Sequence, residues 1–415
     1  MRVNPQNNVN KIFDRNETIG TRAVWAGEGE YLVEGATQVP VVHSVSFGYD
    51  DIDYWLEVAL EKKPGHIYSR NTNPTVRAFE EKVRILEGGE AATSFSTGMA
   101  AISGTLFTLL SPGDRVVTIK DTYGGTNKIF TEFLPRFNIE VQLCDTTDHE
   151  QIEAEIAKGA KVVYLESPTN PTVKVTDLER LIRAGHAVGA VCVVDNTFAT
   201  PINQNPISLG ADIVIHSATK FLGGHADALG GVAVGRADLI KKIYHYREIN
   251  GATLDPMAAY LLLRGMKTLH LRIKQQSESA MKIARFLQTQ PLVDKVFYPG
   301  LETHEHHDIA KKQMNMFGGM LSFSLRGDID AVRHFLPKLK YAHLAANLGA
   351  VETVVGPART TSHVECTPEE RAAMGIPESL IRYSVGIEDT DDLINDLQQA
   401  FDYLAAQMPE LLQTR

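Results

Sequence analysis

The chain has 415 residues, of which 43% are hydrophobic and 22% are charged, and its formal net charge is -10. A chain of this size can bury a large core and is expected to form two or more packed domains. The negative charge argues against binding to nucleic acid or to an anionic membrane surface, since both repel an acidic protein. We therefore expect a small-molecule ligand.

The cysteines and the apolar runs favour a reducing cytoplasm. Cys144, Cys192 and Cys366 are far apart and odd in number, and the first two lie in apolar strand-like runs where a buried free thiol is expected. Residues 1–8 lack the apolar core of a signal peptide, and no later apolar run is long enough to span a bilayer. The sequence therefore predicts a cytoplasmic protein that does not enter a membrane.

Three regions follow one another along the chain. Residues 1–65 are polar and show no sustained period, which indicates an extended N-terminal arm that needs another surface to hold it. Residues 66–265 alternate between short apolar strands and segments of helical period, which predicts a large α/β domain with a mainly parallel sheet covered on both faces. From residue 266 to 415 the helices lengthen, and a smaller α+β domain is expected.

The individual elements of these regions are also predictable. A helix is expected over 98–110, another over 176–188 with a capping box formed by Thr176 and Glu179, and a long one over 267–287. The predicted strands span 115–120, 139–144, 161–166, 190–195, 211–216 and 319–325. In parallel sheets, ligands bind beyond the carboxyl ends of the strands, so the residues just after each strand are the first candidates for a site.

Three predicted strand ends carry polar residues that suit one site. Asn170 follows one strand, Asp195 closes the next, and Ser217, Thr219 and Lys220 follow the third. A lysine beyond a buried strand, followed by a glycine-rich stretch, suits an amine that bonds covalently to a carbonyl compound. A lone lysine at such a junction is usually a surface residue, and a lone aspartate is usually a turn residue or cap. The combination is what indicates chemistry.

Pyridoxal phosphate (PLP) is a cofactor that needs this combination. It requires a lysine for its aldehyde, a carboxylate that keeps its ring nitrogen protonated, and donors for a phosphate dianion. Lys220, Asp195 and the hydroxyls of Ser217 and Thr219 meet these requirements.

Further segments add candidate ligands. Gly98 and Met99 open a predicted helix, whose free N–H groups and dipole attract a phosphate. Tyr68 and Arg70 are suited to an anion, and Tyr123 follows a strand and can stack on the cofactor ring. Taken singly, each of these is more often an ordinary loop or turn residue.

Seven ordered motifs between about residues 65 and 395 resemble those of the Cys/Met-metabolism PLP-dependent enzymes, the cystathionine γ-synthase-like family of trans-sulfuration. They are Tyr68-Ser-Arg70-x-x-Asn-Pro-Thr, Tyr123-Gly-Gly-Thr, Glu166-Ser-Pro-x-Asn170-Pro, Asp195-Asn-Thr, His216-Ser-x-Thr-Lys220, Leu262-Leu-Arg-Gly-x-Lys-Thr268 and Ile381-Arg382-x-Ser-Val-Gly-Ile-Glu-Asp389. The resemblance implies a PLP-dependent transferase of fold type I: an arm, a large PLP-binding domain and a small C-terminal domain, assembled as a homotetramer of two active dimers.

The resemblance also implies roles for the candidate residues. Lys220 would carry the cofactor, Asp195 would pair with its ring nitrogen, and Tyr123 would stack on the ring and exchange protons. The other implied contacts are Gly98, Met99, Ser217 and Thr219 with the phosphate, Tyr68 and Arg70 with the phosphate of a neighbouring subunit, Asn170 with the ring hydroxyl, Arg382 with the substrate α-carboxylate, and Asn347 and Thr361 with the substrate.

Departures from the family pattern bear on the substrate. Cystathionine lyases and synthases usually carry Glu-Ser-Leu-Gly at the substrate wall, whereas this chain has Ala346-Asn347-Leu-Gly349 and lacks the carboxylate. The Asn-Leu-Gly wording and Thr361 are more like O-acylhomoserine sulfhydrylases, although Val351-Glu-Thr is like the lyase and synthase branch. Gly125 stands where methionine γ-lyases typically have cysteine, which disfavours that activity.

We therefore expect a PLP-dependent γ-elimination or γ-replacement on a homoserine-type amino acid. The leaving group would be unusual, for example an O-linked one as in canavanine, or the reaction would resemble that of an O-acylhomoserine sulfhydrylase or a cystathionine γ-synthase. The exact substrate, the choice between elimination and replacement, the nucleophile and the pathway stay open.

Other functions are weighed against this one. A β-lyase acting on cystathionine or cysteine S-conjugates stays open, and so does a PLP-binding regulator without turnover, although every catalytic position is occupied. The stretch His304-Glu-His306-His307-Asp308 is rich in metal-ligand types, but adjacent imidazoles point in different directions, so a solvated surface and no metal are expected. A dinucleotide-binding dehydrogenase is disfavoured because no Gly-x-Gly-x-x-Gly follows a strand.

Overall fold

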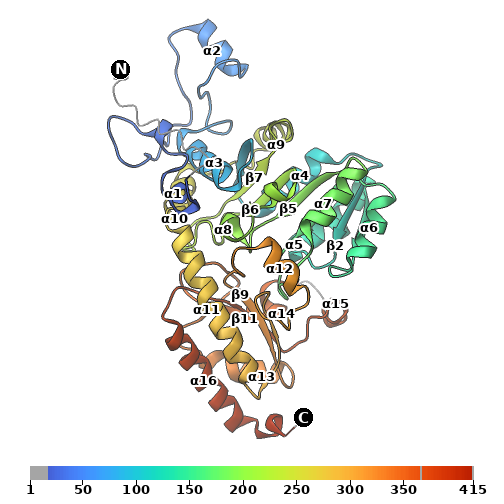
Figure 1. Ribbon diagram of the computed structural model, residues 1–415. Coiled ribbons are helices and arrows are strands. Elements are labelled where there is room, and N and C mark those ends of the chain that lie inside the picture. Colours follow the sequence, from blue (N-terminus) through green and yellow to red (C-terminus); the bar gives the residue numbers. More distant parts are fainter. Residues whose placement is uncertain (1–16, 365–366, 414–415) are drawn as a thin grey trace.

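The computed structural model describes residues 17–364 and 367–413, which form an α/β fold with two β-sheets (Figure 1). Residues 1–8 and Cys366, which were considered above, lie outside the described residues. The strands of the larger sheet are β1 Ala91–Phe95, β2 Arg115–Ile119, β3 Glu140–Cys144, β4 Val162–Glu166, β5 Val191–Asp195, β6 Ile213–Ser217 and β7 Gly231–Gly235.

The larger sheet has the strand order β1-β7-β6-β5-β4-β2-β3. Strands β6, β5, β4, β2 and β3 are parallel to one another, whereas β7 is antiparallel to both of its neighbours. The five parallel strands match the predicted ones to within two residues at each end. Strands β1 and β7 were not predicted. Strand β7 begins and ends with glycine, and it therefore resembles the glycine-rich stretch before it.

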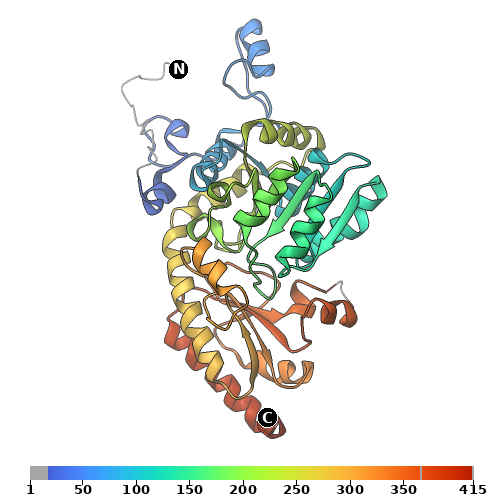
Figure 2. The same cartoon turned by 45° about the vertical axis from the view of Figure 1, so that its right-hand side comes forward.

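Helices cover both faces of this sheet (Figure 2). They are α3 Pro74–Glu87, α4 Gly98–Leu109, α5 Gly124–Lys128, α6 His149–Ala157, α7 Leu178–Ala187, α8 Thr200–Asn203, α9 Ala237–Asn250 and α10 Pro256–Met266, with short η2 Ile129–Phe133, η3 Leu134–Phe137 and η4 Pro206–Leu209. Strand β4 shows why the strands are continuous apolar runs: Val162 and Tyr164 pack in the core on the α4 side, and Val163 and Leu165 pack in the core on the α6 and α7 side.

The predicted capping box at Thr176 is wrong. Helix α7 begins at Leu178, and its N-cap is Asp177, whose carboxylate accepts a hydrogen bond from the backbone N–H of Arg180 at 3.0 Å. The backbone N–H of Thr176 instead donates to the Ser167 hydroxyl at 3.2 Å, so Thr176 is held by the loop after β4.

The second sheet lies in the C-terminal part of the chain and has the strand order β10-β11-β12-β9-β8. Its strands are β8 Val293–Phe297, β9 Met320–Leu325, β10 His343–Leu344, β11 Val354–Pro357 and β12 Leu380–Ser384. The helices of this region are α11 Leu269–Thr289, α12 His307–Gln313, α13 Ile329–Phe335, α14 Ala358–Thr361, α15 Pro368–Ala373 and α16 Thr390–Gln407, with η5 Leu336–Lys338 and η6 Pro409–Leu412. None of the helices in the described part of the chain is long and apolar enough to cross a membrane.

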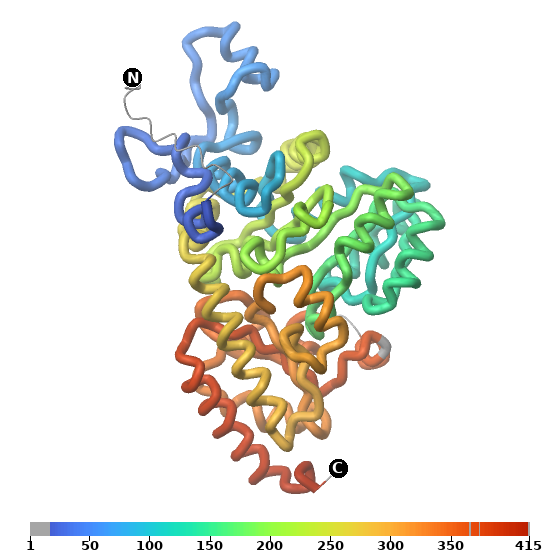
Figure 3. Tube along the Cα trace, viewed as in Figure 1, coloured from blue at the N-terminus to red at the C-terminus, as the bar shows by residue number. Residues whose placement is uncertain are grey.

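Helix α11 joins the two sheets, as the yellow tube in Figure 3 shows. Its buried Arg272 donates hydrogen bonds to the carbonyl oxygens of Phe221, Leu222 and Gly265 at 2.8, 3.2 and 2.9 Å. Two of these carbonyls belong to the turn just after Lys220, so α11 fixes the backbone that carries this lysine.

The N-terminal arm contains regular structure that was not expected from its lack of period. It has α1 Ile19–Trp25, η1 Gly29–Tyr31 and α2 Ile52–Ala59, and α2 is N-capped by Asp51. Both ribbon views place α2 well away from the two sheets (Figures 1 and 2). Ile52 and Leu56 of this helix are 80% and 55% exposed, and large exposed apolar side chains often mark an interaction surface.

A buried ammonium group anchors the start of the arm to the large sheet region. Lys82 of α3 is fully buried, and its Nζ donates to the carbonyl oxygens of Ala23 and Val24 at 2.8 and 3.1 Å and to Glu28 Oε1 at 2.7 Å. Burial lowers the pKa of Lys82 to about 8, although the charge of Glu28 acts in the opposite direction.

We predict that Lys82→Met destabilises the protein by roughly 3 kcal/mol, because it leaves the buried Glu28 without one partner and two carbonyls without their donor. Lys312→Met is the control, since its ion pair with Glu179 is 65% and 50% exposed and should contribute at most about 1 kcal/mol. Denaturant unfolding of both variants checks this. Equal losses of stability would show that Lys82 is not an anchor.

Candidate active site

The carboxyl ends of β4, β5 and β6 open into a cavity of about 200 Å³. Ten of the thirteen predicted site residues line it: Gly98, Met99, Tyr123, Asn170, Asp195, Ser217, Thr219, Lys220, Thr361 and Arg382. The large sheet supplies most of them, whereas Thr361 and Arg382 come from α14 and β12 beside the second sheet. The cavity therefore lies where the two sheets meet.

Three predicted residues do not line the cavity. Asn347 instead accepts a hydrogen bond from Lys220 through its side chain. Tyr68 and Arg70 lie between the arm and α3. The Arg70 guanidinium carbon is 5.7 Å from the centre of the Tyr68 ring, and the guanidinium donates a hydrogen bond to the carbonyl oxygen of Glu248 in α9. Within one chain, these two side chains do not reach the site.

Lys220 has a buried and oriented amine. Its Nζ donates to Asn347 Oδ1 at 2.9 Å. Burial, together with the positive charge of Arg382, lowers the pKa of Lys220 to about 8. Close packing fixes the position, because a Cβ added to Gly349 would lie 2.6 Å from the backbone nitrogen of Phe221. The amine is thus neutral at a lower pH than an exposed lysine, which favours bonding to a carbonyl group.

Two carboxylates lie side by side at the cavity, because Glu166 and Asp195 are opposite each other on β4 and β5. Asp195 accepts hydrogen bonds from the Thr197 N–H and hydroxyl at 3.0 and 2.6 Å. Glu166 accepts one from the Tyr123 N–H at 2.9 Å. Burial, strengthened by the charge of Asp195, raises the pKa of Glu166 well above its usual range, so Glu166 keeps its proton to a higher pH than an exposed glutamate.

Asp195 is a buried carboxyl group whose surroundings suit a positively charged ligand. It is 7% exposed, and burial raises its pKa while the hydrogen bonds from Thr197 lower it. No lysine, arginine or histidine nitrogen of the described residues lies within 4.0 Å of it. A protonated pyridine ring in the cavity would supply the missing positive charge.

The start of α4 forms a cradle for an anion. Thr97 caps this helix by accepting from the Ala100 N–H at 3.0 Å, and the N–H groups of the first turn have no partner within the helix. A Cβ added to Gly98 would lie 2.8 Å from the Ser217 hydroxyl oxygen, so only glycine leaves room beside that hydroxyl. This cradle fits the phosphate of PLP, and Lys220 and Asp195 in the same cavity suit the aldehyde and the ring nitrogen of PLP.

Arg382 is placed for a substrate carboxylate. It is 4% exposed, and its guanidinium donates to Asn170 Oδ1 at 3.3 Å and to the Asn347 carbonyl oxygen at 3.1 Å. Burial lowers its pKa to about 10, so it keeps its charge at neutral pH. Its remaining N–H groups suit a bidentate contact with a carboxylate.

Eight further residues line the cavity that were not named as site residues: Thr97, Ile102, Glu166, Thr197, Phe198, Leu229, Ala346 and Leu348. Glu166, Thr197, Ala346 and Leu348 stood inside the quoted motifs, and Thr97 directly precedes the predicted helix start at Gly98, so a signal was available for each of them. The apolar residues Phe198 and Leu229 had none, because nothing in their local sequence separates a cavity wall from an ordinary core.

The histidine-rich stretch lies elsewhere and is more ordered than expected. His306 and His307 are half-buried rather than solvated, and their Nδ1 atoms are within hydrogen-bond distance of the carbonyl oxygens of Val175 and Pro299, at 3.0 and 2.8 Å. The two imidazoles are thus held by different backbone segments.

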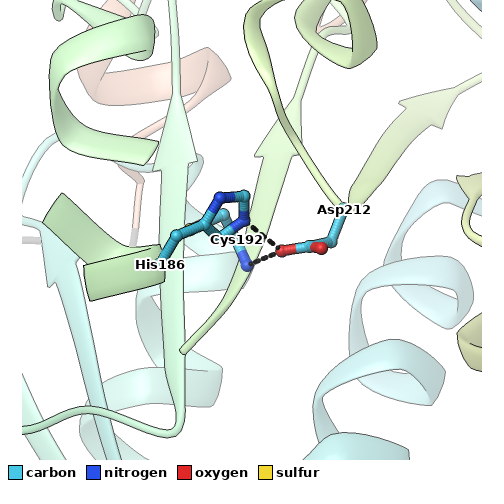
Figure 4. Close-up of side chains that lie close together, drawn as sticks. All are labelled: His186, Cys192 and Asp212. Atoms are coloured by element: carbon cyan, nitrogen blue, oxygen red, sulfur yellow. Dashed lines mark hydrogen bonds and ion pairs between the residues drawn. The ribbon is translucent and has the colours of Figure 1, made fainter. Parts of the chain in front are cut away.

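One group of metal-ligand types occurs in the described part of the chain: His186, Cys192 and Asp212 (Figure 4). The Asp212 carboxylate is already engaged, since it accepts from His186 Nε2 at 2.9 Å, from the Cys192 N–H at 2.8 Å and from Arg236 at 3.2 Å. This group ties the end of α7 to the amino ends of β5 and β6, at the opposite edge of the sheet from the cavity.

Comparison with known proteins gives a consistent result. The family model described as Cys/Met metabolism PLP-dependent enzyme matches residues 20–402. L-methionine gamma-lyase of Fusobacterium nucleatum subsp. polymorphum is 42% identical over 92% of this chain and 98% of that protein. O-succinylhomoserine sulfhydrylase of Pseudomonas aeruginosa is 41% identical over 80% and 83% of the two chains.

A solved structure is also similar. Cystathionine gamma synthase from Xanthomonas oryzae pv. oryzae, in complex with aminoacrylate and cysteine, superposes with a TM-score of 0.89 and 38% sequence identity, covering 94% of this chain and 99% of that one.

We predict that the rate at which the cofactor-free protein captures PLP rises about tenfold per pH unit below the pKa of Lys220 and levels off above it, since only the neutral amine attacks an aldehyde. The plateau should begin near pH 8, because the pKa of Lys220 is lowered to about 8. Stopped-flow absorbance checks this. Arg382→Met removes a neighbouring positive charge and should move the plateau to higher pH, and an unmoved plateau would contradict the assigned cause.

Proposed function

The chain belongs to the Cys/Met metabolism PLP-dependent enzymes, and on this premise we propose that it catalyses γ-elimination or γ-replacement on a homoserine-type amino acid with an O-linked leaving group. It is a PLP-dependent enzyme of trans-sulfuration chemistry, and its cofactor is pyridoxal 5'-phosphate. The observation that best supports this proposal is the convergence of Lys220, Asp195 and Arg382 on one cavity.

We assign the cofactor contacts to the residues that line this cavity. Lys220 holds the aldehyde, Asp195 the ring nitrogen and Asn170 the ring hydroxyl. The phosphate is assigned to Gly98, Met99, Ser217 and Thr219. When bound, PLP supplies an electron acceptor that stabilises negative charge on the substrate carbons next to its amine.

The protein residues then have separate tasks. Lys220 takes up and returns protons at Cα and Cβ, for which its lowered pKa of about 8 and its position in the cavity suit it. Arg382 orients the substrate through its α-carboxylate. Tyr123 lines the cavity with its backbone held by Glu166, so its hydroxyl is our candidate for protonating the leaving group.

The wall of the cavity supports an O-linked rather than a cystathionine-type leaving group. Ala346 lines the cavity at the position where cystathionine enzymes of the family usually carry glutamate, and it offers no charge to the distal amino group of cystathionine. Gly125 lies against Met99 and Tyr123, where a Cβ would be 3.0 Å from each, and it offers no thiol to a methionine-type substrate. The names of the relatives reported above refer to different substrates, so they do not indicate which leaving group this chain uses.

We also propose that two copies of the chain complete each site, within a homotetramer. Tyr68 and Arg70 follow the arm directly and lie outside the cavity of their own chain, and the arm presents exposed apolar residues such as Trp55. A neighbouring copy that binds this arm would receive both side chains at its phosphate cradle.

A cytoplasmic location is proposed as well, supported by the free, buried thiols of Cys144 and Cys192.

The substrate proposal is tested by assaying O-acetylhomoserine, O-succinylhomoserine, canavanine, methionine and cystathionine side by side. We expect an O-linked homoserine derivative to give the highest kcat/KM and homoserine or 2-oxobutanoate as product. Ala346→Glu should raise kcat/KM for cystathionine roughly tenfold, and Ala345→Glu, whose side chain does not line the cavity, should not. A preference of the unaltered enzyme for cystathionine, or pyruvate as the product, would contradict the proposal.

The shared site is tested by mixing two inactive variants. Lys220→Ala and Arg70→Ala should each abolish or greatly reduce activity, and random mixing should restore about a quarter of it, since half of the dimers are mixed and one of their two sites is intact. Lys220→Ala mixed with Asp195→Asn is the control, because both residues line the same chain's cavity and no intact site forms. Mixed oligomers without recovered activity would refute sharing.

A further inference from the structure

A buried polar network lies beneath the three strand ends of the site. Its members His216, Asn196 and Ser167 directly precede or follow the site residues Ser217, Asp195 and Glu166 in the sequence. All three network residues are at most 1% exposed. They cannot touch the substrate, yet each is one residue away from a group that lines the cavity.

Glu87 is the centre of this network. It is the last residue of α3 and is fully buried. His216 Nε2 donates to Glu87 Oε1 at 2.5 Å, and Asn196 Nδ2 donates to the same oxygen at 2.9 Å. One carboxylate oxygen at the end of α3 thus connects β6 to the loop after β5.

Gln204 extends the network to the third strand end. Its side-chain amide donates to Asn196 Oδ1 at 3.0 Å and to the Ser167 carbonyl oxygen at 2.8 Å, and its backbone carbonyl accepts from Asn196 Nδ2 at 2.9 Å. Asn196 is therefore held on both sides, and the backbone on either side of Asp195 has a fixed direction.

The network also carries a charge. A buried carboxylate without a counter-charge is costly, and no lysine or arginine pairs with Glu87 among the described residues, so His216 is its one ionic partner there. A doubly protonated His216 would make the pair neutral overall and would place a positive charge in β6, the strand that neighbours β5. That charge acts on Asp195: burial raises the pKa of this carboxyl, and hydrogen bonds from Thr197 and then the charge of His216 lower it.

We propose that Glu87 and His216 are a positioning pair that holds a positive charge and a rigid backbone beneath Asp195, and thereby keeps Asp195 ionised for the protonated ring nitrogen of the cofactor. This inference rests on the proposed function, in which Asp195 binds that nitrogen.

The holoenzyme with ¹⁵N-labelled PLP tests the pair directly, because the ring-nitrogen resonance reports whether that nitrogen is protonated. The double variant Glu87→Gln/His216→Gln replaces the ion pair with two neutral amides and leaves no unpaired charge, so it avoids the main cause of misfolding. We expect its ring-nitrogen resonance to shift toward that of unprotonated pyridine and its affinity for PLP to fall. We also expect its kcat to fall about tenfold, which corresponds to the loss of about one pK unit of charge interaction, with little change in KM.

A matched control exists on the same sheet. His186 and Asp212 are also a histidine–carboxylate pair, with 2.9 Å between Nε2 and Oδ2, but they lie at the amino ends of β5 and β6 (Figure 4). The variant His186→Gln/Asp212→Asn should leave the resonance and kcat unchanged. Melting temperatures of both double variants separate a loss of stability from a change at the ring.

The outcomes distinguish this inference from the function on which it rests. If the unaltered enzyme shows a protonated ring nitrogen and Asp195→Asn removes that proton, the role of Asp195 stands. A Glu87→Gln/His216→Gln protein that then binds PLP with the resonance and kcat of the unaltered enzyme would overturn the positioning pair alone. An unaltered enzyme whose ring nitrogen is unprotonated would overturn both.

Discussion

The burial of two carboxyl groups side by side, at the carboxyl ends of the strands of the large sheet, is the constraint on which the rest of the site depends. Parallel strands β4 and β5 place Glu166 and Asp195 opposite each other, both almost fully buried. Two carboxylates cannot both be ionised so close together in a poorly solvated site, so one keeps its proton. Glu166 is that one, and its proton leaves Asp195 free to pair with a cation. The chemistry of the site follows from this division.

The carboxylate-binding cation of the site comes from the second sheet, whereas Lys220 follows β6 of the large sheet. Arg382 belongs to β12 of the second sheet, and Asn347, in the loop before β11, accepts from Lys220 with its side chain and from Arg382 with its carbonyl. A single asparagine therefore sets the separation between the base and the carboxylate-binding group. Because Arg272 of α11 also holds the turn after Lys220, the packing of the two sheets against each other controls the geometry of the base.

The arm poses a different physical problem. Helix α2 exposes large apolar side chains far from either core, and exposed apolar patches of this kind often mark an interaction surface. Lys82 anchors only the first part of the arm, near Ala23 and Glu28, and the rest reaches outward. An arm that is fixed at its base and exposes apolar residues at its tip supports the proposed contact with a second copy of the chain, and Tyr68 and Arg70 follow directly after the arm.

Local sequence was enough for much of the fold and for most of the cavity, but not for the contacts across it. Continuous apolar runs identify strands covered on both faces, and parallel strands meet at one edge, so Lys220, Asp195 and Asn170 were predictable as neighbours. The cap of α7 was missed because Asp177 and Thr176 are both preferred N-cap types and the capping-box spacing pointed to Thr176, whereas the loop after β4 holds Thr176 in the folded chain. The bond between Lys220 and Asn347, and the one between Glu87 and His216, join residues more than a hundred positions apart. Periodicity specifies which face a side chain takes, whereas the partner that meets it there is chosen only when sheets and helices pack, so these pairs belong to the tertiary structure.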